Sequence, residues 1–130
     1  MTTGAQPPRP TDAELEILAV LWNTGPATVR QVHELISQRR PAQYSTILKF
    51  MQIMADKGLL LRDEEQRAHI YRAARPREWT QQQLAGHLLE RAFSGSAKAL
   101  LVGALSAKKT TKAELAELRK LVDEYAKGAK

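Results

Sequence analysis

Residues 43–46 are Gln-Tyr-Ser-Thr, four consecutive side chains that can form hydrogen bonds, and Lys49 follows about one helical turn later. A Gln amide can pair with adenine N6 and N7, and a Thr methyl group can contact the methyl group of thymine. The first turn of a helix in the DNA major groove directs such side chains at base edges. The composition favours an A·T-containing half-site. The candidate base-reading residues are Gln43, Tyr44, Ser45, Thr46 and Lys49.

Arginines lie on both sides of this segment. Long cationic side chains bind phosphates and orient a protein on DNA without reading its sequence. The candidate backbone-contacting residues are Arg30, Arg39, Arg40, Arg62, Arg67 and Arg72. Residues 28–75 hold nine basic and five acidic side chains, within a chain of net charge +6. Three of the acidic residues are consecutive, at 63–65, which argues against deep insertion of that segment into DNA.

A helix and a hairpin are expected to position these residues. The candidate segment is followed by apolar residues with the spacing of one helix face, at Ile47, Leu48, Met51 and Met54. Phe50 lies beside this stripe. Lys57 and Gly58 are typical of a helix end. Two short strands should then flank residues 63–66, with Arg67, His69 and Tyr71 alternating onto one face.

Two more helices are predicted before this one. Thr11 and Glu14 have the spacing of a capping box, and Gly25-Pro26 ends the first helix. The apolar stripe of that helix is Leu15, Leu18, Ala19, Leu21 and Trp22. The second helix starts at Thr28, closes at residues 39–41, and has the stripe Val29, Val32, Leu35 and Ile36. Three helices and a basic hairpin predict a winged helix-turn-helix DNA-binding domain over residues 11–76.

Helical patterns continue over residues 80–93, around 100–105 and over 111–126. These helices are too apolar to stand alone and too few to enclose a core. We therefore expect residues 77–126 to form a helical dimerisation domain, so that the fold is mainly α and the chain a homodimer. The candidate dimerisation residues are Leu84, Leu88, Leu100, Leu101, Leu105, Leu115, Leu118, Val122 and Tyr125. Residues 1–10 and 127–130 are interpreted as tails.

Several functional classes are disfavoured by composition. The chain has no cysteine, which rules out disulfides and thiolate metal sites. No apolar run approaches the ~20 residues needed to span a bilayer, and no secretory signal is present, so we expect a soluble cytoplasmic protein without membrane insertion. Only His87 and Glu90 have a helical metal-ligand spacing, which is as often an exposed helix contact. We expect no metal, no cofactor and no enzymatic activity.

The order and spacing of six short motifs resemble the BlaI/MecI/CopY penicillinase-repressor family of winged-helix regulators over about residues 11–126. The motifs are Leu15-Glu16-Ile17-Leu18 with Leu21-Trp22, Gly25-Pro26-Ala27-Thr28-Val29-Arg30, Tyr44-Ser45-Thr46-Ile47, Lys57-Gly58-Leu59, Arg67-Ala68-His69-Ile70-Tyr71 and Phe93-Ser94-Gly95-Ser96. The resemblance implies a dimeric repressor that binds a palindromic operator in double-stranded DNA through two winged helices. It also implies intertwined C-terminal helices and, for many members, release by proteolysis that begins with a membrane sensor metalloprotease.

Two features depart from the family pattern. The copper-responsive branch uses a cysteine-rich C-terminal motif, which this chain lacks. The penicillinase branch is cut at an Asn–Phe bond, and the matching positions here are Gly103 and Ala104. The inducing signal, the operator and the regulated genes do not follow from the sequence.

Some residues, and the chain as a whole, allow more than one interpretation. Lys57 is interpreted mainly as a helix-end cation, Ser45 as either a helix cap or a DNA contact, and Tyr44 as a packing or a reading residue. Arg62 and Arg72 could be solvated strand residues. The alternatives for the whole chain are a winged-helix protein-interaction module, a nonspecific nucleoid-type DNA binder and a ligand-gated regulator.

Overall fold

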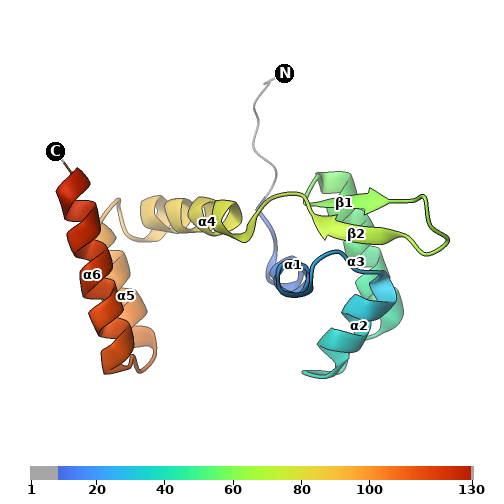
Figure 1. Ribbon diagram of the computed structural model, residues 1–130, viewed down its shortest axis with the longest axis horizontal. Helices are drawn as coiled ribbons and strands as arrows, with labels where there is room; N and C mark the ends of the chain where they lie inside the picture. Colours follow the sequence, from blue (N-terminus) through green and yellow to red (C-terminus); the bar gives the residue numbers. More distant parts are fainter. Residues whose placement is uncertain (1–8, 130) are drawn as a thin grey trace, which may run out of the picture. The chain divides into compact units, whose positions relative to one another are not determined.

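The computed structural model of the chain describes residues 9–129. Its elements are α1 (Asp12–Thr24), α2 (Val29–Ser37), α3 (Tyr44–Lys57), β1 (Leu60–Asp63), β2 (Ile70–Ala73), α4 (Arg77–Ala92), α5 (Ala97–Ala107) and α6 (Lys112–Gly128) (Figure 1). They confirm the predicted mainly helical fold with a two-stranded hairpin. The chain divides between Leu84 and Ala85 into two compact units. The tail predicted at residues 1–10 falls almost wholly outside the described residues, as does Lys130.

Local signals place the starts of α1 and α2. The Thr11 hydroxyl accepts a hydrogen bond from the Glu14 backbone N–H, and the Glu14 carboxylate accepts one from the Thr11 backbone N–H at 2.9 Å. The predicted capping box is therefore formed. Thr28 and Gln31 form a second capping box at the start of α2. That helix ends at Ser37, so residues 39–41 belong to the connection between α2 and α3.

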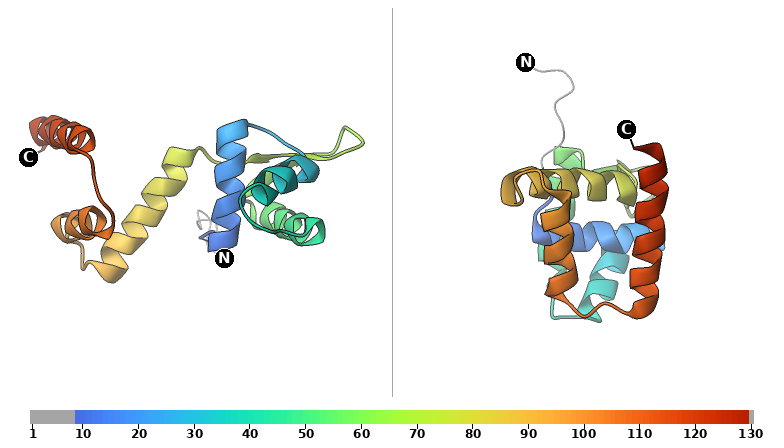
Figure 2. Two further views of the ribbon diagram at one scale, coloured as in Figure 1. Left: turned by 90° about the horizontal axis from the view of Figure 1, so that it is seen from below. Right: turned by 90° about the vertical axis from the view of Figure 1, so that its left-hand side faces the viewer.

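The core of the first unit lies among α1, α2, α3 and the hairpin. Its most deeply buried residues include Val32, Ile36, Met51 and Met54, each 0% exposed. The predicted stripe of α1 was incomplete, because Ile17 and Val20 are also buried. Since α1 contacts α2, α3 and β2, more than one of its faces is covered, and a single-stripe pattern underestimates its burial (Figure 2).

The hairpin pairs β1 and β2 antiparallel, with Arg62 opposite Tyr71 and Leu61 opposite Arg72. Ala27 adds a bridge to β2 through two hydrogen bonds with Tyr71. Leu60 and Tyr71 are each 1% exposed, so their face of the sheet packs on the helices. The predicted alternation of Arg67, His69 and Tyr71 along one strand was wrong in part. Arg67 and His69 lie in the loop between the strands, and only Tyr71 lies in β2.

The second unit is built differently. α5 and α6 bury no residue, and every element pair in extended contact belongs to the first unit. Ser96 and Thr111 cap the two helices by accepting backbone hydrogen bonds from Ala99 and Glu114. In the right-hand view of Figure 2, α5 and α6 both extend to the same side of the segment that joins them, so the chain runs antiparallel through the two helices. Several large apolar side chains of α4, α5 and α6 are exposed: Leu88, Leu101, Val102, Leu115, Leu121, Val122 and Tyr125.

Candidate nucleic-acid interface

The start of α3 presents the predicted base-reading residues to solvent. Gln43 is the N-cap residue, and its side chain makes no capping hydrogen bond. Tyr44, Ser45 and Thr46 form the first turn, and all three are exposed, as is Lys49 one turn further on. The interpretation of Ser45 as the helix cap was wrong, because Ser45 is the second residue of the helix. The first turn of α3 is therefore an accessible, polar helix end of the kind that can enter a DNA groove.

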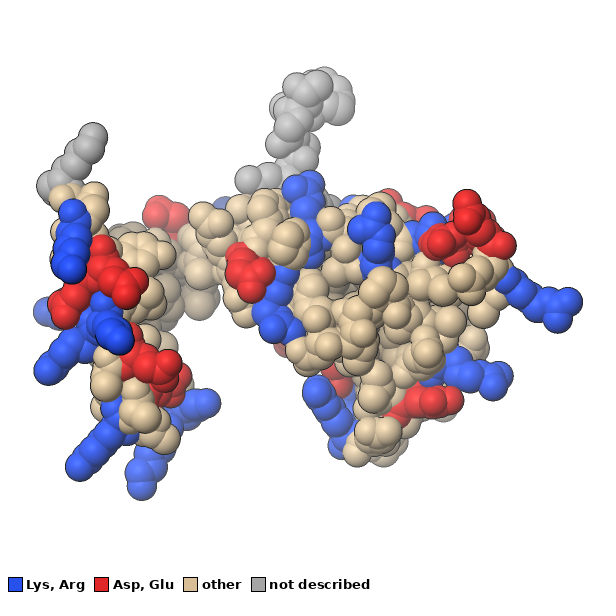
Figure 3. Space-filling view, in the orientation of Figure 1, with Lys and Arg blue, Asp and Glu red and all other residues tan. Residues whose placement is uncertain are grey.

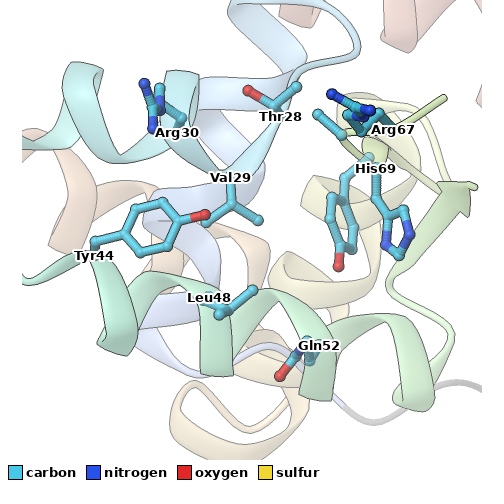
Figure 4. Close-up of a pocket in the computed structure, with 10 residues that line it drawn as sticks. Thr28, Val29, Arg30, Tyr44, Leu48, Gln52, Arg67 and His69 are labelled. Atoms are coloured by element: carbon cyan, nitrogen blue, oxygen red, sulfur yellow. The ribbon is translucent and has the colours of Figure 1, made fainter.

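A groove of about 420 Å³ lies beside this helix end, between α2, α3 and the hairpin (Figure 4). α3 contributes Tyr44, Leu48 and Gln52, which follow one another along one side of the helix. The start of α2 contributes Thr28, Val29 and Arg30, and the hairpin contributes Arg67, Ala68, His69 and Tyr71. The fold thus brings Arg30 and Arg67 to one groove, although they are far apart in sequence. Its two arginines make the groove a candidate phosphate-binding surface.

Arg40 and Thr46 lie at a second hollow, of about 560 Å³, where the α2–α3 connection meets α3. Gln43 and Ile47 also line it. The predicted reading residues are therefore divided between the two sides of α3, with Tyr44 at the groove and Gln43 and Thr46 at the hollow.

Two of the predicted phosphate-binding arginines already have protein partners. Arg40 donates to both carboxylate oxygens of Glu16 through Nε and Nη2, with the shortest contact 2.6 Å, and this bonding lowers the pKa of Glu16. The Nη1 group of Arg40 donates to the Pro41 carbonyl. Arg62 Nε lies 2.9 Å from a carboxylate oxygen of Glu64. The pKa of Arg62 is raised mainly by its hydrogen bond with the Tyr71 hydroxyl and, to a smaller extent, by its hydrogen bond with the Glu64 carboxylate. Both arginines are held in place, which restricts the phosphates that they can reach.

Charges of both signs meet on the hairpin. Figure 3 shows acidic side chains gathered where the hairpin ends, with a basic side chain projecting beside them. The acidic residues of this segment are Asp63, Glu64 and Glu65, whereas Arg67 and Arg72 are exposed further along. Arg72 lies opposite Leu61, on the sheet face away from Tyr71. Of the hairpin arginines, Arg67 therefore faces the groove of Figure 4, and Arg72 faces solvent on the other side of the sheet.

Lys57 has a role that its position at a helix end did not reveal. Its ammonium group lies 2.9 Å from Glu14, whose side chain is 3% exposed. Burial raises the pKa of Glu14, but the hydrogen bonds from Lys57 and Thr11 outweigh that effect and leave the pKa below its ordinary value. The pair joins the start of α1 to the end of α3. It is structural support for the candidate reading helix rather than part of its exposed surface.

Several groove residues were not predicted as site residues, and among them Thr28, Gln52 and His69 carry polar side chains. Gln52 had a usable signal, because residues 44, 48 and 52 are spaced by four and so share one side of a helix. Thr28 and His69 had none, since their place depends on how α2 and the hairpin meet α3.

Residues 9–129 contain no group of three or more His, Asp or Glu side chains that could hold a metal ion. No helix of the same range is long and apolar enough to cross a bilayer.

The chain is similar to known proteins in both sequence and structure. The sequence profile of the family described as Penicillinase repressor matches residues 10–124. Two Mycobacterium tuberculosis proteins named Transcriptional regulator BlaI, from strains CDC 1551 / Oshkosh and ATCC 25618 / H37Rv, are each 39% identical over 93 residues. These alignments cover 70% of this chain and 67% of each relative. A solution structure of the DNA binding domain of the repressor BlaI has 25% identity and a TM-score of 0.50, covering 55% of this chain and 88% of that one.

Proposed function

Because the chain belongs to the penicillinase repressor family, whose members are transcriptional regulators rather than enzymes, we propose that it represses transcription as a homodimer bound to a palindromic operator. The observation that carries the proposal is the exposed polar first turn of α3 beside a groove lined by Arg30 and Arg67. In this arrangement α3 reads base edges, and the surrounding arginines orient the protein on phosphates. A protein acting in this way works in the cytoplasm.

The residue roles follow from the two sides of α3. We propose that Tyr44 contacts bases from the groove side of α3 and that Ser45 and Lys49 do so from the outer face of the helix. Gln43 and Thr46 are proposed to contact bases from the side on which Arg40 lies. Arg30, Arg39, Arg67 and Arg72 are proposed to bind phosphates. Arg40 and Arg62 would do so in the orientation that Glu16 and Glu64 impose.

The dimer part of the proposal is supported by the second unit. α5 and α6 bury nothing within one chain, yet they expose Leu101, Leu115 and Val122. A soluble protein rarely leaves so many large apolar groups uncovered, and a second copy would cover them symmetrically. Two winged helices related by a two-fold axis would then bind half-sites about one helical turn apart or a little more.

Binding measurements on the full chain test the proposal. The wild-type protein should select a palindromic site from a random-sequence duplex library, and should bind that site more tightly than a scrambled duplex of the same composition. The logarithm of its affinity should fall linearly with the logarithm of salt concentration. Equal affinity for both duplexes would favour a nonspecific DNA binder, and no binding to either would favour a protein-interaction module.

Release by proteolysis is the second part of the proposal and rests on the family alone. Gly103 and Ala104, which match the bond cut in the penicillinase branch, lie inside α5. A protease needs an extended strand of substrate, so α5 must open locally before cleavage there. A membrane sensor metalloprotease with a different residue preference would be required. Co-expression of such a protease from the neighbouring genes, followed by mass measurement of the fragments, would locate the cleaved bond or show that the chain stays intact.

A further inference from the structure

His33 connects α2 to the start of α3. Its Nε2 atom lies 2.8 Å from the carbonyl oxygen of Ala42. Because a carbonyl oxygen can only accept, Nε2 carries the hydrogen and donates it. The Ser37 hydroxyl lies 3.2 Å from the same nitrogen. Ala42 immediately precedes Gln43, the N-cap residue of α3, so the bond holds the backbone at the point where that helix begins.

The same imidazole also contacts the first residue of α3. The rings of His33 and Tyr44 have centroids 5.8 Å apart and planes at 81°, an edge-to-face arrangement. Such contacts are favourable and directional. One side chain of α2 thus holds both the backbone before α3 and the aromatic ring of its first turn.

This support matters because α3 lacks the device that fixes the starts of α1 and α2. Those helices begin with complete capping boxes, whereas Gln43 makes no side-chain capping bond. The connection is also held through Arg40, which bonds to Glu16 and to the Pro41 carbonyl. The start of α3 is therefore oriented by contacts from α1 and α2 rather than by its own cap.

We propose that His33 is a positioning residue for sequence discrimination, which directs Tyr44 and the first turn of α3 without touching DNA. The inference rests on the proposed function, because it requires α3 to read bases. Base contacts depend on side chains being held to within a fraction of an ångström, whereas long arginine side chains tolerate small shifts when they bind phosphates. Loss of the His33 contacts should therefore reduce discrimination more than it reduces nonspecific affinity.

The test compares wild type, His33→Leu and His33→Gln on two duplexes. One duplex carries the site that the wild-type protein selects from a random-sequence library, and the other is a scramble of the same composition. His33→Leu should lower the ratio of the two affinities roughly tenfold, the size expected for loss of one good base contact. His33→Gln should restore most of the ratio, because its amide nitrogen can donate to Ala42 from a similar position. Partial unfolding lowers both affinities by the same factor, so it does not change the ratio.

Glu34→Gln is the matched control. Glu34 is exposed on the same helix, next to His33 in sequence, and its neutralisation should shift both affinities together and leave their ratio unchanged. A wild-type ratio of one would refute the proposed function before the variants are considered. If the wild-type ratio is well above one and His33→Leu has the same ratio, the role of His33 is refuted while the proposed function stands. Failure of His33→Gln to restore a ratio lost in His33→Leu would overturn the part assigned to the hydrogen bond with Ala42, because Gln supplies that donor but not the ring that contacts Tyr44.

Discussion

The two units of this chain differ in what covers their apolar side chains. In the first unit, α1, α2, α3 and the hairpin enclose residues such as Val32, Ile36 and Met51, which are 0% exposed. In the second unit, α5 and α6 leave Val122 56% and Tyr125 75% exposed. Both units contain helices with apolar residues at helical spacing, so the pattern alone does not separate them. The first unit covers its own large apolar side chains, whereas the second leaves them exposed, which is the reason for proposing that a second copy covers them.

The largest expected effect is on association. Val122→Asp puts a carboxylate into the surface proposed to be buried between protomers, and it should weaken dimerisation by about 3 kcal/mol or more, because an unpaired buried charge is strongly unfavourable. Sedimentation equilibrium checks the association constant. Leu61→Asp is the matched control, since Leu61 is 44% exposed on the outer face of the hairpin and should leave association unchanged. Equal weakening by both variants, or a monomeric wild type, would contradict the comparison.

The next effect concerns the closed core. Met51→Ala should lower the free energy of unfolding by about 2–5 kcal/mol, because it leaves a cavity among fully buried neighbours. Leu121→Ala, at a position that is 48% exposed, should cost about 0.5 kcal/mol or less at concentrations where the chain is monomeric. Urea denaturation measures both. If the two substitutions had equal effects under those conditions, the distinction between the units would fail.

The pair of Glu14 and Lys57 tests how the core of the first unit tolerates a buried charge. Lys57→Met should destabilise the chain by about 1–3 kcal/mol at neutral pH, because it leaves a buried carboxylate with fewer partners. The pKa of Glu14 lies below its ordinary value of 4.5, so the stabilisation is complete above that pH and is lost as the pH falls through the folded-state pKa. The difference between wild type and variant should therefore shrink in acid.

Thermal melts across the acid range measure this difference. Lys49→Met removes an exposed lysine from the same helix and should have little effect on stability at any pH. If the stability difference between wild type and Lys57→Met stayed constant down to low pH, the ion pair would not be the cause of that difference.

The smallest expected effects come from two glycines, one in each unit. Gly58 ends α3 at a φ of 84°, so Gly58→Ala should cost about 1 kcal/mol through backbone strain. Gly103 lies inside α5, where an added Cβ would meet the Phe93 ring at an ordinary distance of 3.4 Å. Gly103→Ala should therefore stabilise the chain by about 0.5–1 kcal/mol through helix propensity. Shifts of the melting temperature in the same direction for both would contradict this assignment.

Much of the fold could be predicted because its signals are local. The capping box of Thr11 and Glu14 and the helix end at Gly58 each involve residues within one turn of each other. The burial of Ile17 and Val20 could not be predicted in this way. A periodic pattern assumes one covered face, and α1 is covered by α2, α3 and β2.

The candidate site was predictable to a similar extent. The first turn of α3 followed from composition and from the position of the helix start. The loop position of Arg67 and His69 could not be predicted from the sequence. The regular pairing of the hairpin ends at Asp63 and Ile70, where no residue type marks the change.

The sequence by itself determined the order of the elements, the polar first turn of α3 and the apolar character of the C-terminal helices, because each depends on neighbours along the chain. Only the tertiary structure decided that Arg30 and Arg67 share a groove, that Lys57 bonds to Glu14 and that His33 holds Ala42. These pairings join different elements. They depend on the distances and angles at which the helices and the hairpin pack, and no spacing within a single segment encodes those.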